Sequence, residues 1–508
     1  MRLWNKIFSR VTLVSLAILI QLVWLFVIVY YLSADYMIIG LIFSFFSLCA
    51  AIAIVNRPGN PWVKLAWIVP IMTFPLLGGL LYFLSGGTKP ERSLRRALEE
   101  SQKRLAPLNV GSADADSLPD SRIAGQCRYL GSRGFPLYGN TDAAYYADVR
   151  AGWERLLDDL RSAEKFIFME YFIIHPGVMW DAVVEILTEK AAAGVDVRVM
   201  YDDFGSITSV PRKYNSQLEE KGIRCVAFNR YKPVYSVVMN HRDHRKITVV
   251  DGHVGWTGGA NMADEYIKET VRFGDWKDNL VRMEGEGVRG LTLLFLQMWD
   301  AVLPGGASGD GNDAFMPDPV KAAAVRCPGY VLPYGDSPMD DEILAENVYL
   351  NIINQASEYV WIASPYVIVD YEMTRALCLA VRRGVDVRLV APAIPDKKVV
   401  YRLTESHFPE LLDNGVKVYT YTPGFVHSKC FLCDDRLAVI GTVNTDYRSL
   451  TLHFENACLF VDHPVLSSVR ADFEDTFAVS ALVSDRPRKA PLIRKFWMGI
   501  LRLLAPLF

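Results

Sequence analysis

Two stretches of the chain follow one pattern: HRKITVVDGHVGWTGGAN at residues 244–261 and HSKCFLCDDRLAVIGTVN at residues 427–444. Both fit H-x-K-x4-D-x6-G-[GT]-x-N without a gap. Side chains two positions apart on a β-strand point to the same face, so the His and Lys of each stretch reach one place. The pattern therefore predicts two copies of one functional unit.

The sequence around these stretches is duplicated as well. The run GVDVRVM at residues 194–200 returns as GVDVRLV at residues 384–390, at a spacing too long for a solenoid repeat. Amphipathic runs alternate with short β-branched runs, which is typical of an α/β fold with a largely parallel sheet. We expect two α/β repeats at residues 123–304 and 326–485, joined by a Gly-, Asp- and Pro-rich connector at 305–325.

The N-terminal part of the chain is apolar. Residues 11–32 and 36–55 carry no charged side chain, and each is long enough as a helix to cross about 30 Å of hydrocarbon. A third apolar stretch, 62–84, contains Pro70 and Pro75, which interrupt a helix. We therefore expect two transmembrane helices followed by a re-entrant or interfacial segment.

The basic residues that flank these stretches predict the topology. Lys and Arg precede the first stretch and follow the second and third, and none lies in the loop of the hairpin. The positive-inside rule places such clusters in the cytoplasm, which two spans satisfy and three do not. We expect a membrane segment at residues 1–88 with the large domain that follows it in the cytoplasm.

Two further segments flank the repeats. Residues 89–122 are basic and polar, and we expect a linker there. Residues 486–508 alternate six basic side chains with large apolar ones, which predicts a basic amphipathic helix on an anionic membrane surface. A helix that packs against the protein's own core is the alternative.

Composition excludes several classes of protein. The 54 basic and 57 acidic residues leave a net charge of −3, which argues against a nucleic-acid-binding protein. The eight cysteines are scattered, unlike those of a secreted disulfide scaffold. Cys430 and Cys433 face opposite sides of a strand, and no second pair completes a metal site.

The residue types of the doubled pattern suit phosphodiester chemistry. Two ammonium groups offset the charge that grows on phosphoryl oxygens, and two asparagine amides donate further hydrogen bonds to them. One neutral imidazole attacks phosphorus while the other acts as general acid and base, so no metal is required. The residues concerned are His244, Lys246, Asn261, His427, Lys429 and Asn444.

The doubled pattern resembles the signature of the phospholipase D superfamily. The run HRKITVVDGHVGWTGGANMADEY and the segment from Trp67 to Tyr82 are similar to the bacterial cardiolipin synthases in particular. The resemblance implies two phospholipase D-like α/β sandwich repeats that share one active site, preceded by an N-terminal transmembrane hairpin in the bacterial cell (inner) membrane. It also implies phosphatidyl transfer from one phosphatidylglycerol to another, with release of glycerol and without a cofactor.

The resemblance also assigns roles. It implies a phosphohistidine at His244, with His427 as the acid and base, and it places an orienting acid at Asp278 and at Glu455. Asp251 and Asp434 close the two motifs. Because these two residues lie at strand ends before turns, we expect them to brace the site.

Alternatives stay open at this point. The same residues serve a membrane phospholipase D that hydrolyses phospholipid to phosphatidic acid. A non-enzymatic membrane scaffold is a second alternative, although intact His, Lys and Asn in both copies argue against it. The acceptor lipid is phosphatidylglycerol or another lipid alcohol such as phosphatidylethanolamine, and the spacing of the motifs does not decide which histidine is the nucleophile.

Overall fold

A computed structural model describes most of the 508-residue chain. The described residues are 37–57, 60–74, 92–230, 240–303, 311–340, 342–484 and 492–505, with single positions at 19, 23, 27, 78, 79 and 82. They form two compact units. The larger contains residues 92–228 and 242–488, and the smaller contains the described parts of 1–91, 229–241 and 489–508.

The smaller unit consists of helices. Helix α3 (Met37–Val55) coincides with the second predicted span, whereas most of the first, 11–32, lies outside the described residues. Asn60 caps α4 (Pro61–Thr73) by accepting a hydrogen bond from Trp62 N, and α4 contacts both α3 and α18 (Leu492–Leu504). Within the described residues, the structure contains no helix with both the length and the apolar character that crossing a membrane requires.

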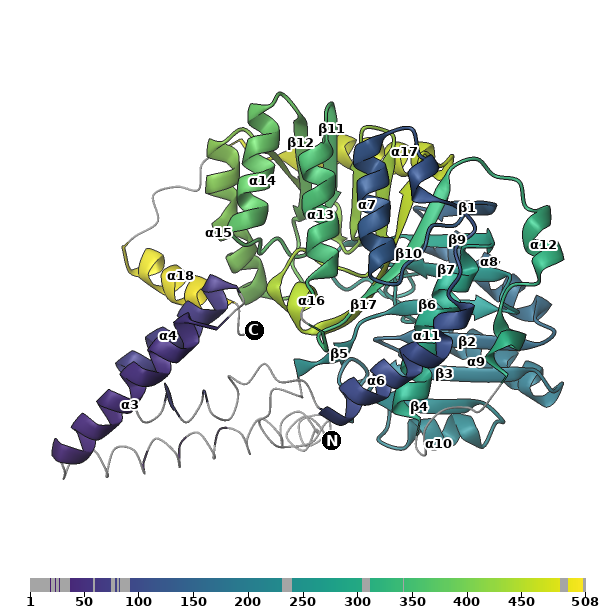
Figure 1. The fold of residues 1–508 in the computed structure, drawn as a ribbon, viewed down its shortest axis with the longest axis horizontal. Coiled ribbons are helices and arrows are strands. Elements are labelled where there is room, and N and C mark those ends of the chain that lie inside the picture. Colours follow the sequence, from purple (N-terminus) through teal and green to yellow (C-terminus); the bar gives the residue numbers. More distant parts are fainter. Residues whose placement is uncertain are drawn as a thin grey trace. The chain divides into compact units, whose positions relative to one another are not determined.

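The larger unit contains the two repeats, and each is built on one mixed β-sheet (Figure 1). The first sheet has the strand order β1-β9-β7-β6-β2-β3-β4. Its strands are β1 (Thr141–Tyr146), β2 (Phe166–Tyr171), β3 (Asp196–Asp202), β4 (Arg224–Phe228), β6 (Lys246–Val250), β7 (Val254–Gly258) and β9 (Leu280–Gly285).

The second sheet repeats this order as β10-β17-β16-β15-β11-β12-β13, with β18 added at its edge. Its strands are β10 (Tyr330–Asp336), β11 (Tyr359–Ala363), β12 (Asp386–Pro392), β13 (Lys417–Tyr421), β15 (Cys430–Cys433), β16 (Leu437–Gly441), β17 (His453–Val461) and β18 (Ser480–Leu482). The identical order confirms the predicted duplication.

The prediction of a largely parallel sheet is wrong. In the first sheet only β2, β3 and β4 pair in parallel, and the remaining pairs are antiparallel. The same holds for β11, β12 and β13 among the matching strands of the second sheet. Parallel neighbours need a crossover, which helices supply here, whereas β6 and β7 are joined by the short turn at Asp251 and therefore run antiparallel.

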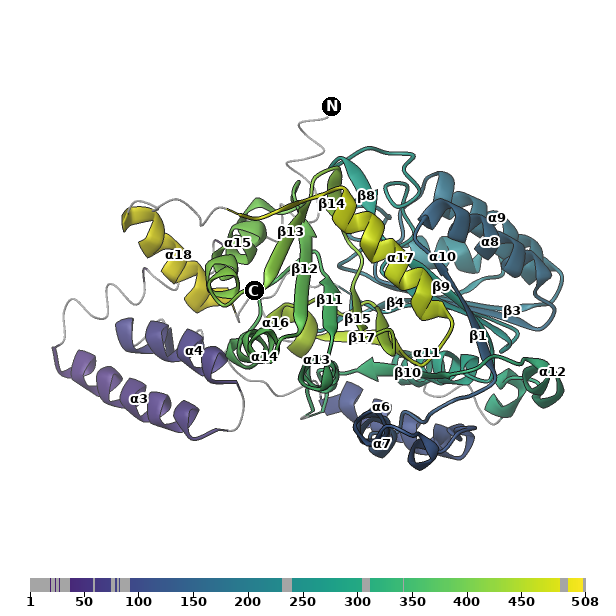
Figure 2. The ribbon, with the colours of Figure 1, turned by 90° about the horizontal axis from the view of Figure 1, so that it is seen from above.

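Helices cover the outer face of each sheet. In Figure 2, α8 (Val149–Ser162) and α9 (Val178–Ala192) lie side by side, and they form a core cluster with the first sheet. Helices α13 (Leu344–Gln355) and α14 (Tyr371–Arg382) do the same for the second sheet. The remaining outer helices are α7 (Ser121–Ser132), α10 (Tyr214–Glu219), α15 (Lys398–Asp413) and α16 (Tyr447–Thr451).

A central core joins the two repeats. It contains inner-face side chains of both sheets together with α11 (Val288–Val302) and α17 (Val465–Ala478). Helix α6 (Arg92–Leu105) buries Leu98 and Leu105 in this core, so the segment expected to be a polar linker belongs to the larger unit from residue 92 onward.

Two short segments complete the larger unit. The described part of the expected connector forms a 3-10 turn (Asn312–Phe315) and α12 (Pro319–Ala324), and Phe315 packs on Phe166 and Phe168. Two further 3-10 turns, Ala106–Leu108 and Ala115–Ser117, lie between α6 and α7.

Candidate active site

Two short strand pairs cross from one repeat to the other and place the two motif histidines. Strand β5 (Arg242–Asp243) pairs in parallel with the start of β17, and His244 N donates to Phe454 O at 2.9 Å. Strand β14 (Gly424–Val426) pairs in parallel with β8 (Asp275–Lys277), and His427 N donates to Lys277 O at 2.7 Å. His244 therefore lies beside the strand that carries Glu455, and His427 lies beside the strand that Asp278 directly follows.

The histidine–carboxylate pairs are crossed between the repeats. His244 Nδ1 lies 2.8 Å from Glu455 Oε2, and His427 Nδ1 lies 2.6 Å from Asp278 Oδ2. Both histidines are about nine-tenths buried, and both carboxylates are buried. One repeat alone therefore completes neither pair, so the site requires both copies.

These pairs fix the protonation of the imidazoles. An ionised carboxylate only accepts hydrogen bonds, so Nδ1 of each histidine carries the proton. Nε2 is then left with its lone pair, in the form that attacks an electrophile or accepts a proton.

The two lysines lie in the same buried place. Lys246 Nζ donates to His244 O at 2.6 Å, and Lys429 Nζ lies 3.1 Å from His427 Nε2. Burial lowers the pKa of Lys246 to about 7, with repulsion from Lys429 as a further cause. Burial likewise lowers the pKa of Lys429, to about 8.

Burial and these cations keep both imidazoles neutral. Burial is the main cause that lowers the pKa of His427 to about 4, and Lys429 adds to it, against the opposing effect of Asp278. The pKa of His244 lies well below its usual value for the same two reasons, with Lys246 and Lys429 as the cations. Burial raises the pKa of Asp278, but its interactions with His427 and Lys429, including the hydrogen bond from His427, outweigh burial and leave that pKa lowered.

The carboxylates are held differently in the two halves. Thr442 Oγ1 and Ser449 Oγ both donate to Glu455. The Thr442 hydroxyl, from the Gly441-Thr442 pair of the second motif, therefore holds Glu455 in place. In the first repeat the matching position is Gly259, where a Cβ atom would lie 2.0 Å from Asp278 Oδ1.

The two motif asparagines are also buried beside the site. Asn261 Oδ1 accepts from Ile173 N at 3.0 Å, and its Nδ2 donates to Tyr266 Oη at 2.7 Å. Asn444 N donates to Ser449 Oγ at 3.0 Å, and the Asn444 Oδ1 atom has no hydrogen-bond partner.

Two aromatic side chains follow equivalent strand ends. The ring centroid of Phe172 lies 5.0 Å from that of His244, and Lys246 Nζ lies 5.7 Å from the Phe172 ring. Tyr366, which follows β11 and matches Ile173 in the sheet register, donates to Asp396 Oδ2 at 2.5 Å. Phe172 therefore contacts a candidate catalytic side chain.

Asp251 and Asp434 lie away from the histidines. Asp251 accepts hydrogen bonds of 2.8 Å from three successive main-chain N–H groups, those of residues 164–166. Asp434 accepts from the main-chain N–H groups of residues 357–359. Since a strand rises about 3.3 Å per residue, seven residues put each aspartate at the strand end opposite its histidine. These aspartates brace the turn that precedes β2 or β11.

The side chains of Cys430 and Cys433 enter different cores. Cys430 belongs to the central cluster, and Cys433 belongs to the outer cluster of the second sheet. The strand alternation that separates them is the one that the sequence predicts.

Sequence reasoning missed three residues of the site. Asn279 and Asn456 follow the two acids, and Asn456 Oδ1 accepts from Lys246 N at 3.0 Å across the repeats. The doubled acid–Asn pair was the signal that could have found them. His453 also lies in the site, with its ring centroid 5.5 Å from that of His244. Its counterpart is Trp276, so the repeat gave no signal for it.

The fold and site together define a two-repeat phosphodiester-transfer centre, in which two buried histidines and two buried lysines share one place. The family model described as "Cardiolipin synthase, PLD-like domain" matches residues 156–271 and 349–477, and the one described as "Phospholipase_D-nuclease N-terminal" matches residues 39–87.

Similar proteins agree with these matches. Cardiolipin synthase 2 of Bacillus anthracis is 32% identical over 91% of this chain and 90% of its own length. An uncharacterized protein of Streptococcus mutans is 41% identical over 89% of this chain and 98% of its own. The phosphatidylserine synthase structure from Haemophilus influenzae shares the fold, with a TM-score of 0.56 and 14% identity over 72% of this chain and 95% of that one. The chain belongs to the cardiolipin synthase family of phospholipase D-like proteins.

Proposed function

We propose that this protein is a cardiolipin synthase that transfers a phosphatidyl group from one phosphatidylglycerol to another and releases glycerol. The observation that carries the proposal is the pair of crossed contacts, His244 with Glu455 and His427 with Asp278. Together with Lys246 and Lys429 they supply one nucleophile, one proton donor and two cations to a single buried place.

The first step forms a covalent intermediate. His244 Nε2 attacks phosphorus, and a P–N bond forms while the P–O bond to the glycerol headgroup breaks. His427, protonated at Nε2, gives its proton to the departing glycerol oxygen. Lys246 and Lys429 stabilise the charge that grows on the non-bridging oxygens, where desolvation strengthens each interaction.

Substrate binding prepares the acid. Repulsion from the buried lysines is one cause of the lowered pKa of His427. A phosphodiester anion between these groups offsets that repulsion and favours protonation of the imidazole. We propose that the substrate thereby brings the site to its reactive protonation state.

The second step reverses the roles. His427, now neutral, takes the proton from the primary hydroxyl of a second phosphatidylglycerol. The resulting oxygen attacks phosphorus, the P–N bond breaks, and His244 returns to its starting form. The apolar contact of Phe172 with His244 supports a mouth that favours a lipid alcohol over water.

We also propose that the protein is a multi-pass protein of the bacterial cell membrane with its catalytic unit in the cytoplasm. The second predicted span forms α3, which exposes Leu41, Phe45 and Ile52. Helix α18 exposes Leu492, Ile493, Phe496 and Trp497, which supports its placement on an anionic lipid surface. The re-entrant segment at 62–84 and the hairpin of spans at 11–32 and 36–55 remain part of this proposal.

A lipid assay tests the activity. The full chain in detergent–phosphatidylglycerol micelles, without added metal, is followed by mass spectrometry for cardiolipin, glycerol and phosphatidic acid. Cardiolipin with equimolar glycerol is the expected result. Phosphatidic acid alone means that water takes the phosphatidyl group, and product formed only when phosphatidylethanolamine is added identifies a different acceptor.

A further inference from the structure

A third imidazole stands beside the first histidine–carboxylate pair. His453 opens β17, two residues before Glu455, and its Nδ1 lies 3.6 Å from Glu455 Oε1. Only 8% of His453 is exposed, and neither of its ring nitrogens makes a hydrogen bond, so Nδ1 has only this longer ion-pair contact and Nε2 has no partner. A buried polar group without a partner is costly, so these nitrogens need an explanation.

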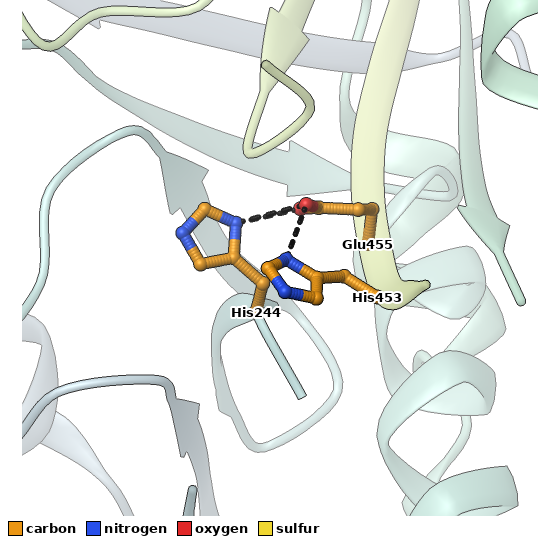
Figure 3. A group of neighbouring side chains, drawn as sticks. All are labelled: His244, His453 and Glu455. Carbon is orange, nitrogen blue, oxygen red and sulfur yellow. Dashed lines mark hydrogen bonds and ion pairs between the residues drawn. The ribbon is translucent and has the colours of Figure 1, made fainter. Parts of the chain in front are cut away.

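The ligand atoms of three residues converge there. One nitrogen of His244, one nitrogen of His453 and one oxygen of Glu455 all lie within 4.8 Å of one another. Figure 3 shows both imidazoles turned toward the same carboxylate. It is the one such group among the residues that the structure describes.

We propose that His244, His453 and Glu455 form an inhibitory binding site for a divalent transition-metal ion of the zinc class. Two imidazoles and one carboxylate are a common donor set for zinc, with a fourth position left open. Metal–ligand bonds of about 2.0–2.2 Å need donor atoms a little over 3 Å apart, which small movements of these side chains provide. Thr442 and Ser449, which donate to Glu455, supply the outer contacts that such a carboxylate usually has.

The ligand atoms and the nearby lysines determine which class of metal ion this place can hold. Lys246 and Lys429 oppose any cation at this place, but Lys246 directs its ammonium group to His244 O and not to Nδ1. Magnesium and calcium prefer sets of oxygen ligands and gain little from imidazole. An ion with high affinity for imidazole is therefore expected here.

The other half of the site lacks this group. Trp276 stands where His453 does, and its ring lies 5.5 Å from that of His427. An indole offers no lone pair to a metal. The His427–Asp278 pair thus provides an internal control with two ligands and no third.

Metal binding would block catalysis by a proton movement, a step that rests on the proposed function. The metal binds Nδ1 of His244 and replaces the proton that Nδ1 otherwise donates in its hydrogen bond to Glu455. The neutral imidazole then carries its proton on Nε2, so the lone pair that attacks phosphorus is lost.

The first experiment measures binding and needs no turnover. The full chain in detergent micelles is dialysed against Zn²⁺, and bound zinc is quantified for wild type, His453→Asn, His453→Gln and His253→Asn. His253 pairs with Glu284 at 3.1 Å without a third ligand, so its variant is the matched control. We expect one zinc per chain in wild type and the control, and affinity lower by about tenfold or more in both His453 variants.

The second experiment measures inhibition. Zn²⁺ is titrated into the lipid assay, with each variant referred to its own metal-free rate, and Mg²⁺ serves as the comparison ion. We expect chelator-reversible inhibition of wild type by zinc alone, and at least about a tenfold higher inhibitory concentration for the His453 variants. Wild type that holds no zinc, or His453 variants that bind as tightly while circular dichroism shows them folded, overturns the proposal. Zinc binding without any lipid turnover leaves the metal site standing and refutes the proposed activity.

Discussion

His244 and His427 occupy equivalent positions in repeats of identical strand order, yet their surroundings differ. The carboxylate that holds His244 is Glu455, which receives two side-chain hydroxyls and has His453 beside it. The carboxylate that holds His427 is Asp278, which packs against the bare backbone of Gly259. His427 itself is flanked by Trp276.

This difference teaches how a duplicated fold produces a chemically asymmetric site. The backbone pairings that cross the repeats are the same in both directions, so the histidine–carboxylate geometry is preserved. The side chains on and around those strands differ, as His453 and Trp276 do at matching positions of the two pairings. A reaction that needs one nucleophile and one acid can use such divergence, because the two imidazoles then differ in environment.

The largest expected effect comes from the histidines themselves. His244→Ala removes the nucleophile and lowers turnover by about 10⁴-fold or more, whereas His427→Ala removes the acid and lowers turnover by about 10²–10⁴-fold. After exposure to phosphatidylglycerol, peptide mass spectrometry of His427→Ala should find a phosphatidyl adduct on residue 244. An adduct on residue 427 in His244→Ala would reverse the two assignments.

The next effect exchanges a residue between the two halves. Gly259→Thr gives the first half the residue of the second, but its Cβ meets Asp278 Oδ1. We expect activity to fall by about 10²-fold and stability by about 1–3 kcal/mol, because overpacking displaces the carboxylate that orients His427. Rates in the lipid assay and denaturant unfolding measure the two effects.

The matched control lies in the other half. Thr442→Ser keeps the hydroxyl that donates to Glu455, so its rate should stay near that of wild type, while Thr442→Val should lose about tenfold. A Gly259→Thr variant as active as Thr442→Ser would show that the halves tolerate the same packing.

Much of this site was predictable from the sequence. The doubled H-x-K spacing located both histidines and both lysines, because two-residue periodicity on a strand is enforced by backbone geometry. The two acids, Asp278 and Glu455, followed from the resemblance to the phospholipase D superfamily, and each of them contacts a motif histidine.

What the sequence did not reveal depends on contacts between distant segments. The crossing of the carboxylates arises from the pairing of β5 with β17 and of β14 with β8, which no local pattern encodes. The antiparallel strand pairs of each sheet were missed because the clearest signal in the sequence was the alternation of helices with strands, which is typical of parallel pairing. His453 has no duplicate, so only its burial beside Glu455 brings it to notice.

A smaller effect concerns the lysines and pH. Buried Lys246 and Lys429 have pKa values lowered to about 7 and about 8, and they bind phosphate only when protonated. The nucleophile must be neutral, and burial lowers the pKa of His244 well below its usual value and that of His427 to about 4. Because free His427 is neutral above about pH 4 and must be protonated to act as the acid, we expect kcat/KM to fall as the pH rises above about 5, and to fall more steeply above about pH 7, where Lys246 also loses its proton.

The kcat profile sharpens this prediction. A bound phosphodiester raises the pKa of both lysines, so the alkaline fall of kcat should lie at a higher pH than that of kcat/KM. Rates from pH 4 to 10 in mixed micelles measure both profiles. Coincident alkaline limbs would mean that the lysines do not contact the phosphate.

The smallest effect on catalysis is expected far from the histidines. Asp434 accepts hydrogen bonds from three successive N–H groups before β11, and Asp251 does the same before β2. These main-chain bonds outweigh burial and lower the pKa of Asp434. Its stabilising contribution is therefore present near neutral pH and is lost in acid, as the pH falls through the lowered pKa.

Asp434→Ala should reduce the free energy of unfolding by about 2–3 kcal/mol. The rate per folded molecule should change by less than about threefold, because the carboxylate lies at the strand end opposite His427. Denaturant unfolding followed by circular dichroism, with turnover measured below the transition, separates the two quantities, and Asp251→Ala is the matched variant in the other repeat. A large loss of rate in either fully folded variant would place the aspartates in the chemistry of the site and remove the distinction between its bracing and its reacting residues.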